Sequence, residues 1–293
     1  MRKRLLCVCM LATILLGIPL AGCSDKTSAV KEDETPSKEG EKKHLTVGTG
    51  KQYATIQAAV DAAKDGDVIE VYPGTYTEAV SVTEKTLTIQ GTDKERCVLQ
   101  YPNGDYMNPP LEMGSGVLKN MTIHATNQTQ LPGTIAKAYA LHIDYHISRN
   151  NTFTIEDVNF INDSYQTLGI GLRNDFTLTF KNCSFVCQRN FNAFYCHDDP
   201  SGKEAPNQRL VVDNCYFENY GTMPTIMLQS QEQVGSDIVC LWTNNEIVNK
   251  GQGKLLDRQF WNPKVSQEEG WLGMTYWKNS SKSAGNTAEE LNG

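Results

Sequence analysis

A short strand–turn–strand pattern recurs six times along the chain and constrains the fold more than any other feature of the sequence. Each copy has an apolar-x-apolar run, a corner residue and a further apolar position. The corners are Gly91, Asn120, Asp157, Asn182, Asn214 and Asn244, with successive spacings of 29, 37, 25, 32 and 30 residues. Such periods indicate a solenoid, in which each coil buries its interior only by stacking on its neighbours. Since Gly, Asn and Asp tolerate left-handed backbone geometry, we expect one kind of corner in every coil.

Residues 44–80 indicate how this solenoid begins. A short β run at 45–47 precedes a helix over 56–63, which Thr55 can cap with its hydroxyl oxygen. The apolar positions on one face of this helix are Ile56, Ala59, Val60 and Ala63. A turn then leads into a strand over 68–72 with alternating side chains. A helix in this place can cover the edge that the first coil would otherwise leave open.

The order of these pieces resembles the N-terminal part of pectin methylesterases. The resemblance implies an all-β fold over residues 44–279, a single-stranded right-handed parallel β-helix with a short N-terminal capping helix. It is most specific at 44–80 and extends through residue 220. An antiparallel sandwich would also contain many short strands. It would not explain the capping helix, or corners of one kind at the same place in each repeat.

The resemblance also implies where catalysis would take place. Pectin methylesterases use one Asp as nucleophile, a second Asp as general acid, an Arg that orients the nucleophile, and Gln side chains that stabilise the oxyanion. Here the segment KAYAL has Lys137 at the Gln position, and SYQTLG keeps Gln166 but lacks the general acid. RNFNAFYC has Asn192 where the nucleophile is needed, and LLDRQFW is only loosely similar to the segment that carries the Arg. We therefore expect the standard esterase chemistry to be absent, and whether the chain is an enzyme stays open.

The residues that we expect to form a polysaccharide-binding face come from several coils. They are Lys137, His142, Gln166, Arg173, Asn192 and His197. Aromatic residues at 139, 145, 165 and 191 would add apolar surfaces on which sugar rings can stack. The candidates for a catalytic role are Gln166, Asn192 and Asp175. The leading hypothesis is a module that binds or processes a pectin-type or cell-wall polysaccharide.

Two other functions stay open. One is an active carbohydrate esterase or polysaccharide lyase with a rearranged site, which would need a carboxylate near Gln166 or a basic residue near a cation. The other is a structural or adhesive envelope protein, which would have no affinity for saccharides.

Two clusters have side chains that suit a metal ion. His142, Asp144 and His146 alternate, so they would share one face of a strand and could hold a divalent cation. Asp198 and Asp199 lie in a segment rich in Gly and Pro, and adjacent carboxylates suit Ca²⁺. Neither cluster shows a full set of ligands, so the sequence favours a solvated polar strand face for the first and a plain polar turn for the second. No other cofactor is expected.

The N-terminal residues predict export and a lipid anchor. Residues 1–22 combine a basic start, an apolar core and small residues before Cys23, as in a bacterial lipoprotein signal. We expect Cys23 to be lipidated, which would hold the protein on the extracellular or periplasmic side of a membrane. Residues 23–43 are highly charged and would form a disordered tether, and 280–293 would form a disordered tail. A transmembrane anchor is the alternative, although the apolar run is short for a span.

The charge balance limits the possible partners. The formal net charge is −7, and removal of Arg2, Lys3 and Arg4 with the signal would take it to −10. An acidic body argues against nucleic acid and against broad electrostatic capture of polyanions. A pectin-type ligand would therefore need local Lys or Arg contacts. A monomer is expected.

The cysteines after position 23 are Cys97, Cys183, Cys187, Cys196, Cys215 and Cys240. They form no CxxC pair and no spacing typical of zinc. Disulfides and buried thiols both stay open, and Cys187–Cys196 is the local pair that could bridge most easily. Cys183 and Cys215 take equivalent places in consecutive repeats, where we expect an interior stack of small apolar groups rather than a redox role.

Overall fold

The computed structural model describes residues 42–102, 109–126, 139–143, 151–163, 165–173, 175–198, 204–205, 208–229, 235–236, 239–259 and 287–288. One helix, α1 (Ile56–Ala62), lies among parallel strands. The strands of a seven-stranded sheet are β4 (Val80–Val82), β7 (Leu111–Met113), β9 (Leu141–Ile143), β11 (Leu168–Leu172), β14 (Phe194–Asp198), β18 (Ile226–Gln229) and β22 (Leu256–Gln259).

A fourteen-stranded sheet forms the rest of the coils. Its strands are β1 (His44–Val47), β2 (Val68–Val71), β3 (Gly74–Thr77), β5 (Leu87–Gly91), β6 (Cys97–Pro102), β8 (Gly116–Thr126), β10 (Thr152–Asn162), β12 (Thr177–Lys181), β13 (Ser184–Cys187), β16 (Arg209–Asp213), β17 (Tyr216–Asn219), β20 (Val239–Thr243), β21 (Glu246–Asn249) and β23 (Thr287–Ala288). A separate pair consists of β15 (Glu204–Ala205) and β19 (Gly235–Ser236). The strand β23 lies in the segment expected to be a disordered tail, and its two residues pair with β21.

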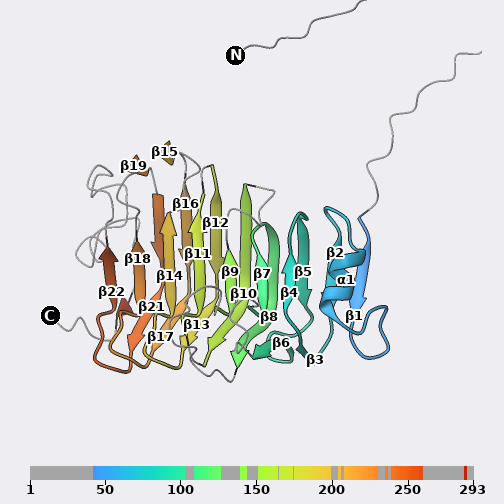
Figure 1. The fold of residues 1–293 in the computed structure, drawn as a ribbon, viewed down its shortest axis with the longest axis horizontal. Coiled ribbons are helices and arrows are strands. Elements are labelled where there is room, and N and C mark those ends of the chain that lie inside the picture. The colour runs from blue at the N-terminus through green and yellow to red at the C-terminus, as the bar shows by residue number, and fades with distance from the viewer. Residues whose placement is uncertain are drawn as a thin grey trace, which may run out of the picture. The chain divides into compact units, whose positions relative to one another are not determined.

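Each strand pairs in parallel with the equivalent strand of the next coil, which is the pattern of a β-helix. In the seven-stranded sheet Leu168 lies opposite Leu141, and Ile170 lies opposite Cys196. The strands of this sheet follow one another in chain order from β4 to β22 (Figure 1). The predicted single-stranded right-handed parallel β-helix is confirmed.

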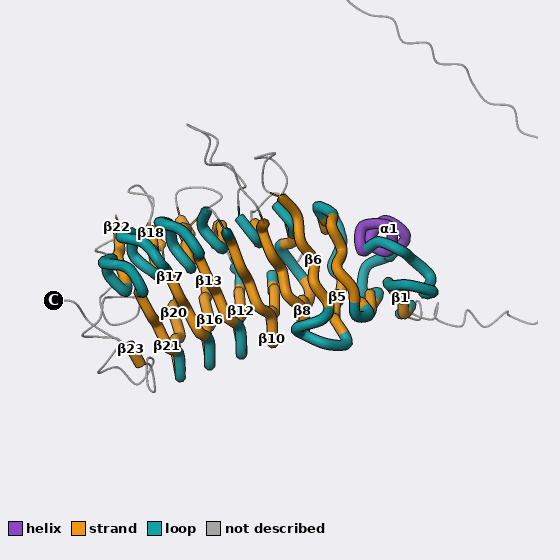
Figure 2. The backbone as a smooth tube through the Cα atoms, turned by 90° about the horizontal axis from the view of Figure 1, so that it is seen from below, coloured by secondary structure: helices purple, strands orange, loops and turns teal. Residues whose placement is uncertain are grey.

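The capping helix is confirmed, one residue shorter than predicted. The Thr55 hydroxyl accepts a hydrogen bond from the Ala58 backbone N–H at 3.3 Å. The carboxylate of Glu78 accepts the N–H groups of Ile56 and Gln57 at 2.7 and 3.0 Å, so further donors of the first turn are satisfied. The predicted apolar face is buried, and α1 lies at the β1 end of the stack of coils (Figure 2). It therefore covers the apolar residues that the first coil would expose.

The predicted corners are confirmed in five coils. Asn120, Asp157, Asn182, Asn214 and Asn244 all have left-handed backbone, with φ between 52° and 57°. Each joins two strands of the fourteen-stranded sheet or bends one long strand, so the chain turns at the same place in each coil. The prediction for Gly91 is wrong, because this residue has no positive φ and ends strand β5.

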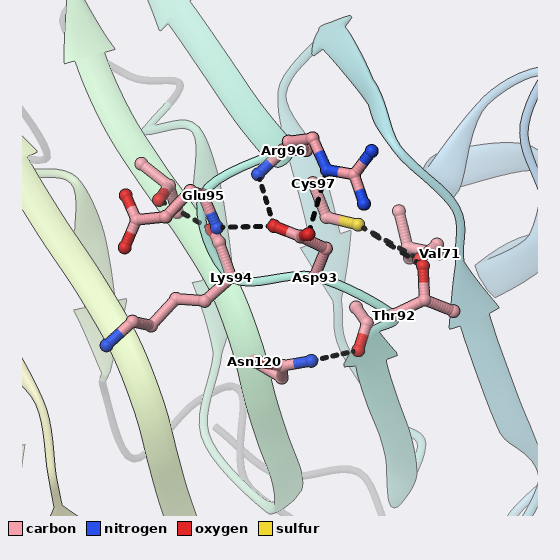
Figure 3. Close-up of polar contacts among 10 residues, drawn as sticks. Val71, Thr92, Asp93, Lys94, Glu95, Arg96, Cys97 and Asn120 are labelled. Atoms are coloured by element: carbon pink, nitrogen blue, oxygen red, sulfur yellow. Dashed lines mark hydrogen bonds and ion pairs between the residues drawn. The ribbon is translucent and has the colours of Figure 1, made fainter.

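In the coil of Gly91 a longer loop replaces the single-residue corner, and the carboxylate of Asp93 holds it together (Figure 3). The carboxylate accepts the backbone N–H groups of Glu95 and Arg96 at 3.1 and 3.0 Å. It also accepts the side-chain Nε–H of Arg96 at 2.8 Å. The loop is tied to the next coil because the Thr122 hydroxyl donates to the Lys94 carbonyl at 2.9 Å. Five residues thus make a turn that one Asn makes elsewhere.

The core is a ladder of apolar side chains, with aromatic rings in the later coils. The rings of Phe160, Phe185 and Phe217 stack in succession, with centroids 5.3 and 4.8 Å apart.

Five cysteines are buried as thiols, namely Cys97, Cys183, Cys187, Cys196 and Cys215. The suggested pair Cys187–Cys196 is therefore reduced in the structure. Within the described ranges, no helix has the length and apolarity needed to cross a membrane.

Candidate functional site

The outer face of the seven-stranded sheet carries a largely buried pair of a histidine and a carboxylate. Across β7 and β9, Glu112 lies opposite His142. The Glu112 carboxylate accepts a hydrogen bond from His142 Nδ1 at 3.2 Å and another from the Ser81 hydroxyl at 3.3 Å. Because a carboxylate only accepts hydrogen bonds, the Nδ1 atom carries the proton. The two side chains are only 13% and 16% exposed, which is unusual for charged groups on the outside of a sheet.

Aromatic rings pack around this pair. The ring of Tyr139 stacks on His142 with centroids 5.6 Å apart and planes within 5°. Tyr165 follows at 5.7 Å from Tyr139, and Phe191 lies 4.4 Å from Tyr165. Tyr139 is 9% exposed, whereas Tyr165 and Phe191 are half-buried. These four side chains, Tyr139, His142, Tyr165 and Phe191, are called the aromatic cluster below.

Gly169 provides the space for this cluster. It lies on β11 opposite His142, and a Cβ atom built on it would lie 2.4 Å from Cε2 of Tyr139. Real atoms never approach that closely, so any other residue at 169 would displace the Tyr139 ring. The missing side chain is thus a requirement for the cluster.

The tyrosine hydroxyls of this region stay protonated at neutral pH. Burial raises the pKa of Tyr139 strongly and that of Tyr165 to about 12, and proximity to Tyr195 adds to both shifts. Burial also raises the pKa of Tyr195, whose hydroxyl donates to the side-chain oxygen of Gln229. These groups can therefore act as neutral hydrogen-bond donors, but they cannot act as bases at neutral pH.

Arg173 lies at the carboxyl end of β11. Its guanidinium carbon is 4.5 Å from the centroid of the Phe176 ring. The Nη2 atom is buried and has no hydrogen-bond partner among the residues that the structure describes. Burial lowers the pKa of this guanidinium. A buried donor on a cation without an acceptor is costly. Arg173 as a whole is only half-buried, so its guanidinium can still offer a charge-assisted contact to an anionic ligand.

A predicted face residue and a predicted catalytic candidate lie near this end of the sheet. His197 on β14 is opposite Gly171 of β11, and its ring centroid is 5.8 Å from that of Tyr195. Asp175, a catalytic candidate from the sequence, is exposed and has left-handed backbone with φ 54°. His142 lies on β9 and His197 on β14 of one sheet, and Arg173 directly follows β11 of the same sheet.

Gln166 and Asn192 lie elsewhere, in the interior of the corner that precedes the seven-stranded sheet. They are 8% and 1% exposed. Gln166 Nε2 donates to Asn192 Oδ1 at 2.9 Å, and Asn192 Nδ2 donates to the Pro224 carbonyl at 2.6 Å. Asn162 Nδ2 donates to the Gln166 carbonyl at 2.8 Å. These amides join successive coils to each other, so their placement gives them a structural role.

Several predicted residues lie outside the described ranges. They are Cys23, Lys137, Asp144, His146 and Asp199, and Asp198 is described only as part of β14. Within the described part of the chain, no three His, Cys, Asp or Glu side chains are grouped so as to hold a metal ion. A Ca²⁺ site therefore stays a prediction from the sequence.

Sequence reasoning missed Glu112, Tyr195 and Gly169. Glu112 is the outward residue of a three-residue strand that carries no copy of the repeat, so only its alternation with Leu111 and Met113 could have indicated it. Gly169 has no side chain to suggest a role. Its importance depends on the ring of Tyr139, which approaches from another coil.

These coils, corners and capping helix define a class of protein, the single-stranded right-handed parallel β-helices. Within that class, the fold is that of pectin methylesterases. Pectin methylesterase PemA from Erwinia chrysanthemi matches with a TM-score of 0.50 and 14% identity, over 74% of this chain and 70% of that one. The enzyme from carrot matches with a TM-score of 0.45 and 13% identity, over 87% and 85% of the two chains. At such low identity the likeness shows the fold alone. No family model matches the sequence, and no curated protein matches it.

Proposed function

We propose that this protein binds an acidic polysaccharide on the outer face of the seven-stranded sheet, at the aromatic cluster and Arg173. The observation that carries the proposal is the cluster itself, which Gly169 makes possible. Sugar rings present apolar CH faces that stack on aromatic side chains, while the hydroxyl groups of the tyrosines can bond sugar oxygens. Tyr165 and Phe191 are the cluster members with most surface open to such a ligand.

Arg173 supports a ligand that carries carboxylates. The residue is half-buried, and its guanidinium can form charge-assisted hydrogen bonds with a uronic-acid carboxylate. Arg173 lies four positions after Gly169, so the two residues are about 13 Å apart along the strand at 3.3 Å per residue. A short oligosaccharide is long enough to reach both. Because the chain has a net charge of −7, the contact with an acidic polymer has to be local.

The position of the corner amides supports binding without the standard esterase chemistry. Asn192 stands at the position that the resemblance assigns to the nucleophile, and an amide is not a carboxylate nucleophile. Both of its side-chain bonds lie in the interior, to Gln166 and to Pro224. The oxyanion role is also unsupported for Gln166, whose amide nitrogen is engaged with Asn192.

A second candidate function is an active carbohydrate esterase with a rearranged site. The buried Glu112–His142 pair favours it, because a carboxylate that holds Nδ1–H places the lone pair of the imidazole on Nε2. Such an imidazole can take a proton from water that attacks an ester carbonyl, and return it to the departing alcohol.

Anchoring belongs to the same proposal and rests on the sequence of residues 1–43. Lipidation of Cys23 would hold the solenoid at a membrane surface, on the exported side, by a polar tether. Replacing Cys23 by Ala is expected to release the protein from the membrane fraction. Retention of the variant in that fraction would contradict the lipid anchor.

The binding proposal is tested with polygalacturonate, methyl-esterified pectin and a neutral glucan, with methanol release measured in the same samples. We expect polygalacturonate to bind most tightly, without methanol release. Tyr165→Ala should weaken binding about 2–12-fold, the equivalent of one aromatic contact. Arg173→Gln should weaken it about 10–100-fold, as expected for a charge-assisted hydrogen bond.

Tyr216→Ala is the matched control, because Tyr216 lies on β17 in the other sheet. It should bind like the unmodified chain. Equal affinity of all variants, or no binding of any polysaccharide, would contradict the proposal. Methanol release that His142→Ala abolishes, with binding retained, would instead establish the second candidate.

A further inference from the structure

Two cysteines occupy the same place in successive coils, directly after the left-handed corners. Ser184 lies opposite Tyr216 in the parallel pair β13–β17, and the Tyr216 N–H donates to the Cys183 carbonyl at 2.9 Å. Cys183 and Cys215, which precede those residues, are therefore neighbours across the coils. Val158 takes this place in the coil before and Asn245 in the coil after, so the cysteine pair occurs once in this row.

The two thiols make the same contact with the backbone. Each donates to the carbonyl two residues before it, at 3.3 Å in both cases. Burial raises the pKa of Cys215 well above its ordinary value, and the neighbouring Cys183 side chain raises it further. Both residues are 2% exposed. The Cys215 thiol is therefore slow to ionise in the folded protein.

A groove of about 530 Å³ runs along these corners. Its walls include both cysteines, together with polar residues of four coils such as Asp157, Asn182 and Asn214. Lys94, from the loop that Asp93 holds, lines the same groove. The two cysteines therefore line a polar surface groove, while their side chains belong to the buried core of the coils.

None of the other cysteines with described side chains has a cysteine opposite it. Cys187 lies opposite Asn162 and Asn219, and Cys196 lies opposite Ile170 and Leu228. Cys97 lies opposite Gly74. Geometry therefore singles out one pair among these thiols, and it is not the pair nearest in sequence.

We propose that Cys183 and Cys215 form a disulfide between coils when the chain folds in the presence of a disulfide oxidant. Neighbouring parallel strands lie about 4.8 Å apart, within the Cα separation of about 4.4–6.8 Å that disulfides accept. The oxidant is a small-molecule or protein disulfide. One cysteine thiolate attacks it and releases one thiol, and the second cysteine then displaces the other. The protein loses two electrons and two protons, and the oxidant becomes two thiols.

The bond would close one whole coil, from Cys183 to Cys215, into a covalent loop. A loop of this length restricts the unfolded chain, and a solenoid gains from it because each coil otherwise depends only on its neighbours. Neither the aromatic cluster nor Arg173 is involved, so this inference is independent of the proposed function.

The test is to refold the full chain from urea in excess glutathione disulfide, alkylate the remaining thiols, and map the disulfides by mass spectrometry. Trypsin leaves Cys183 and Cys187 on one peptide, and Cys215 and Cys240 on another, so a linkage could not be assigned to single cysteines. Chymotrypsin is therefore used, because it cuts after Phe185 and Phe217 and separates them. We expect a Cys183–Cys215 linkage. We also expect Tm to be about 5–10 °C higher than for the reduced chain, and dithiothreitol to reverse the increase.

Cys183→Ser and Cys215→Ser should each abolish both the linkage and the Tm increase, whereas Cys97→Ser should keep both. The double change of Cys183 and Cys215 to Val, the residue that the preceding coil has at 158, checks that loss of the increase is not loss of folding. If both thiols of the refolded chain are alkylated, or if Cys187 is linked to Cys196 instead, the proposal is wrong.

Discussion

At the level of single residues, the absence of a side chain at position 169 determines the shape of the candidate site. The Tyr139 ring occupies the space where a Cβ of residue 169 would lie, with Cε2 only 2.4 Å from it. Gly169→Ala should therefore displace the ring, reduce the free energy of unfolding by about 1–3 kcal/mol and weaken polysaccharide binding. Urea unfolding and the binding titration measure the two effects.

The double variant Gly169→Ala/Tyr139→Ala separates the clash from other effects of the new methyl group. With the ring removed, the added alanine should cost little relative to Tyr139→Ala alone. If Gly169→Ala reduces the free energy of unfolding as much in the Tyr139→Ala chain as in the unmodified chain, the clash with Tyr139 is not the cause of the loss.

A second residue-scale prediction concerns Asp67, a carboxylate that is only 4% exposed. It accepts the backbone N–H groups of Lys43 and Lys64 at 2.9 and 2.8 Å. Burial alone would raise its pKa, but these hydrogen bonds and the two lysine charges lower it overall. Asp67→Ala should reduce the free energy of unfolding at pH 7 by about 1–3 kcal/mol, because two N–H groups lose their acceptor.

The pH dependence follows from the direction of that shift. Since the folded pKa lies below the unfolded value near 3.8, the ionised carboxylate stabilises the fold fully above pH 3.8. This contribution is lost as the pH falls through the folded pKa. The stability difference between Asp67→Ala and the unmodified chain should therefore shrink in acid, as urea unfolding at pH 7 and pH 3 would measure. A difference of equal size at both values would contradict the assignment.

Among the structural elements, the left-handed corners set the path of each coil. Asn214 has φ 52°, and its Nδ2 donates to Asn182 Oδ1 of the preceding coil at 2.8 Å. Asn214→Ala should destabilise by about 1–2 kcal/mol, since an alanine pays the full cost of left-handed backbone. Asn214→Gly should cost less because glycine adopts this geometry freely.

Lys181→Ala is the control for the corner series. Lys181 is exposed, lies on β12 and precedes the corner residue Asn182. Its change should alter the free energy of unfolding by less than about 0.5 kcal/mol. If Asn214→Ala is no more destabilising than Lys181→Ala, the corners do not hold the coil geometry as inferred.

The same elements show how far the sequence predicts the fold. The corners recur at a fixed place and Thr55 begins an amphipathic segment, so local chemistry was enough for the solenoid and its capping helix. The predicted left-handed corner at Gly91 is wrong, because glycine permits left-handed backbone but does not require it. The carboxylate of Asp93 instead stabilises a longer turn in that coil.

The candidate site was less predictable, because its contacts join different coils. Gln166 and Asn192 were expected on the ligand face, yet their amides bond each other across 26 positions of sequence, in the interior. Glu112 pairs with His142 from 30 positions away. Pairing at such distances depends on the register between coils, which the repeat spacing gives only approximately.

At the scale of the whole chain, the two sheets present different surfaces. The outer face of the seven-stranded sheet carries the aromatic cluster, the Glu112–His142 pair and, at the end of β11, Arg173. The corners of the fourteen-stranded sheet carry a polar groove above two thiols. With a net charge of −7, no general attraction draws an acidic polymer to either surface. We therefore assign ligand binding to the first surface and covalent closure of a coil to the second.

The most direct test of the binding claim is hydroxyl-radical footprinting of the full chain with and without oligogalacturonate. Oxidation of Tyr165 and Phe191 should fall when the ligand is present, because both belong to the cluster and are half-buried. Oxidation of Tyr216 and of Tyr220, which is 46% exposed and follows β17, should stay unchanged. Protection of Tyr216 with no change at Tyr165 and Phe191 would place the ligand in the corner groove and contradict the account.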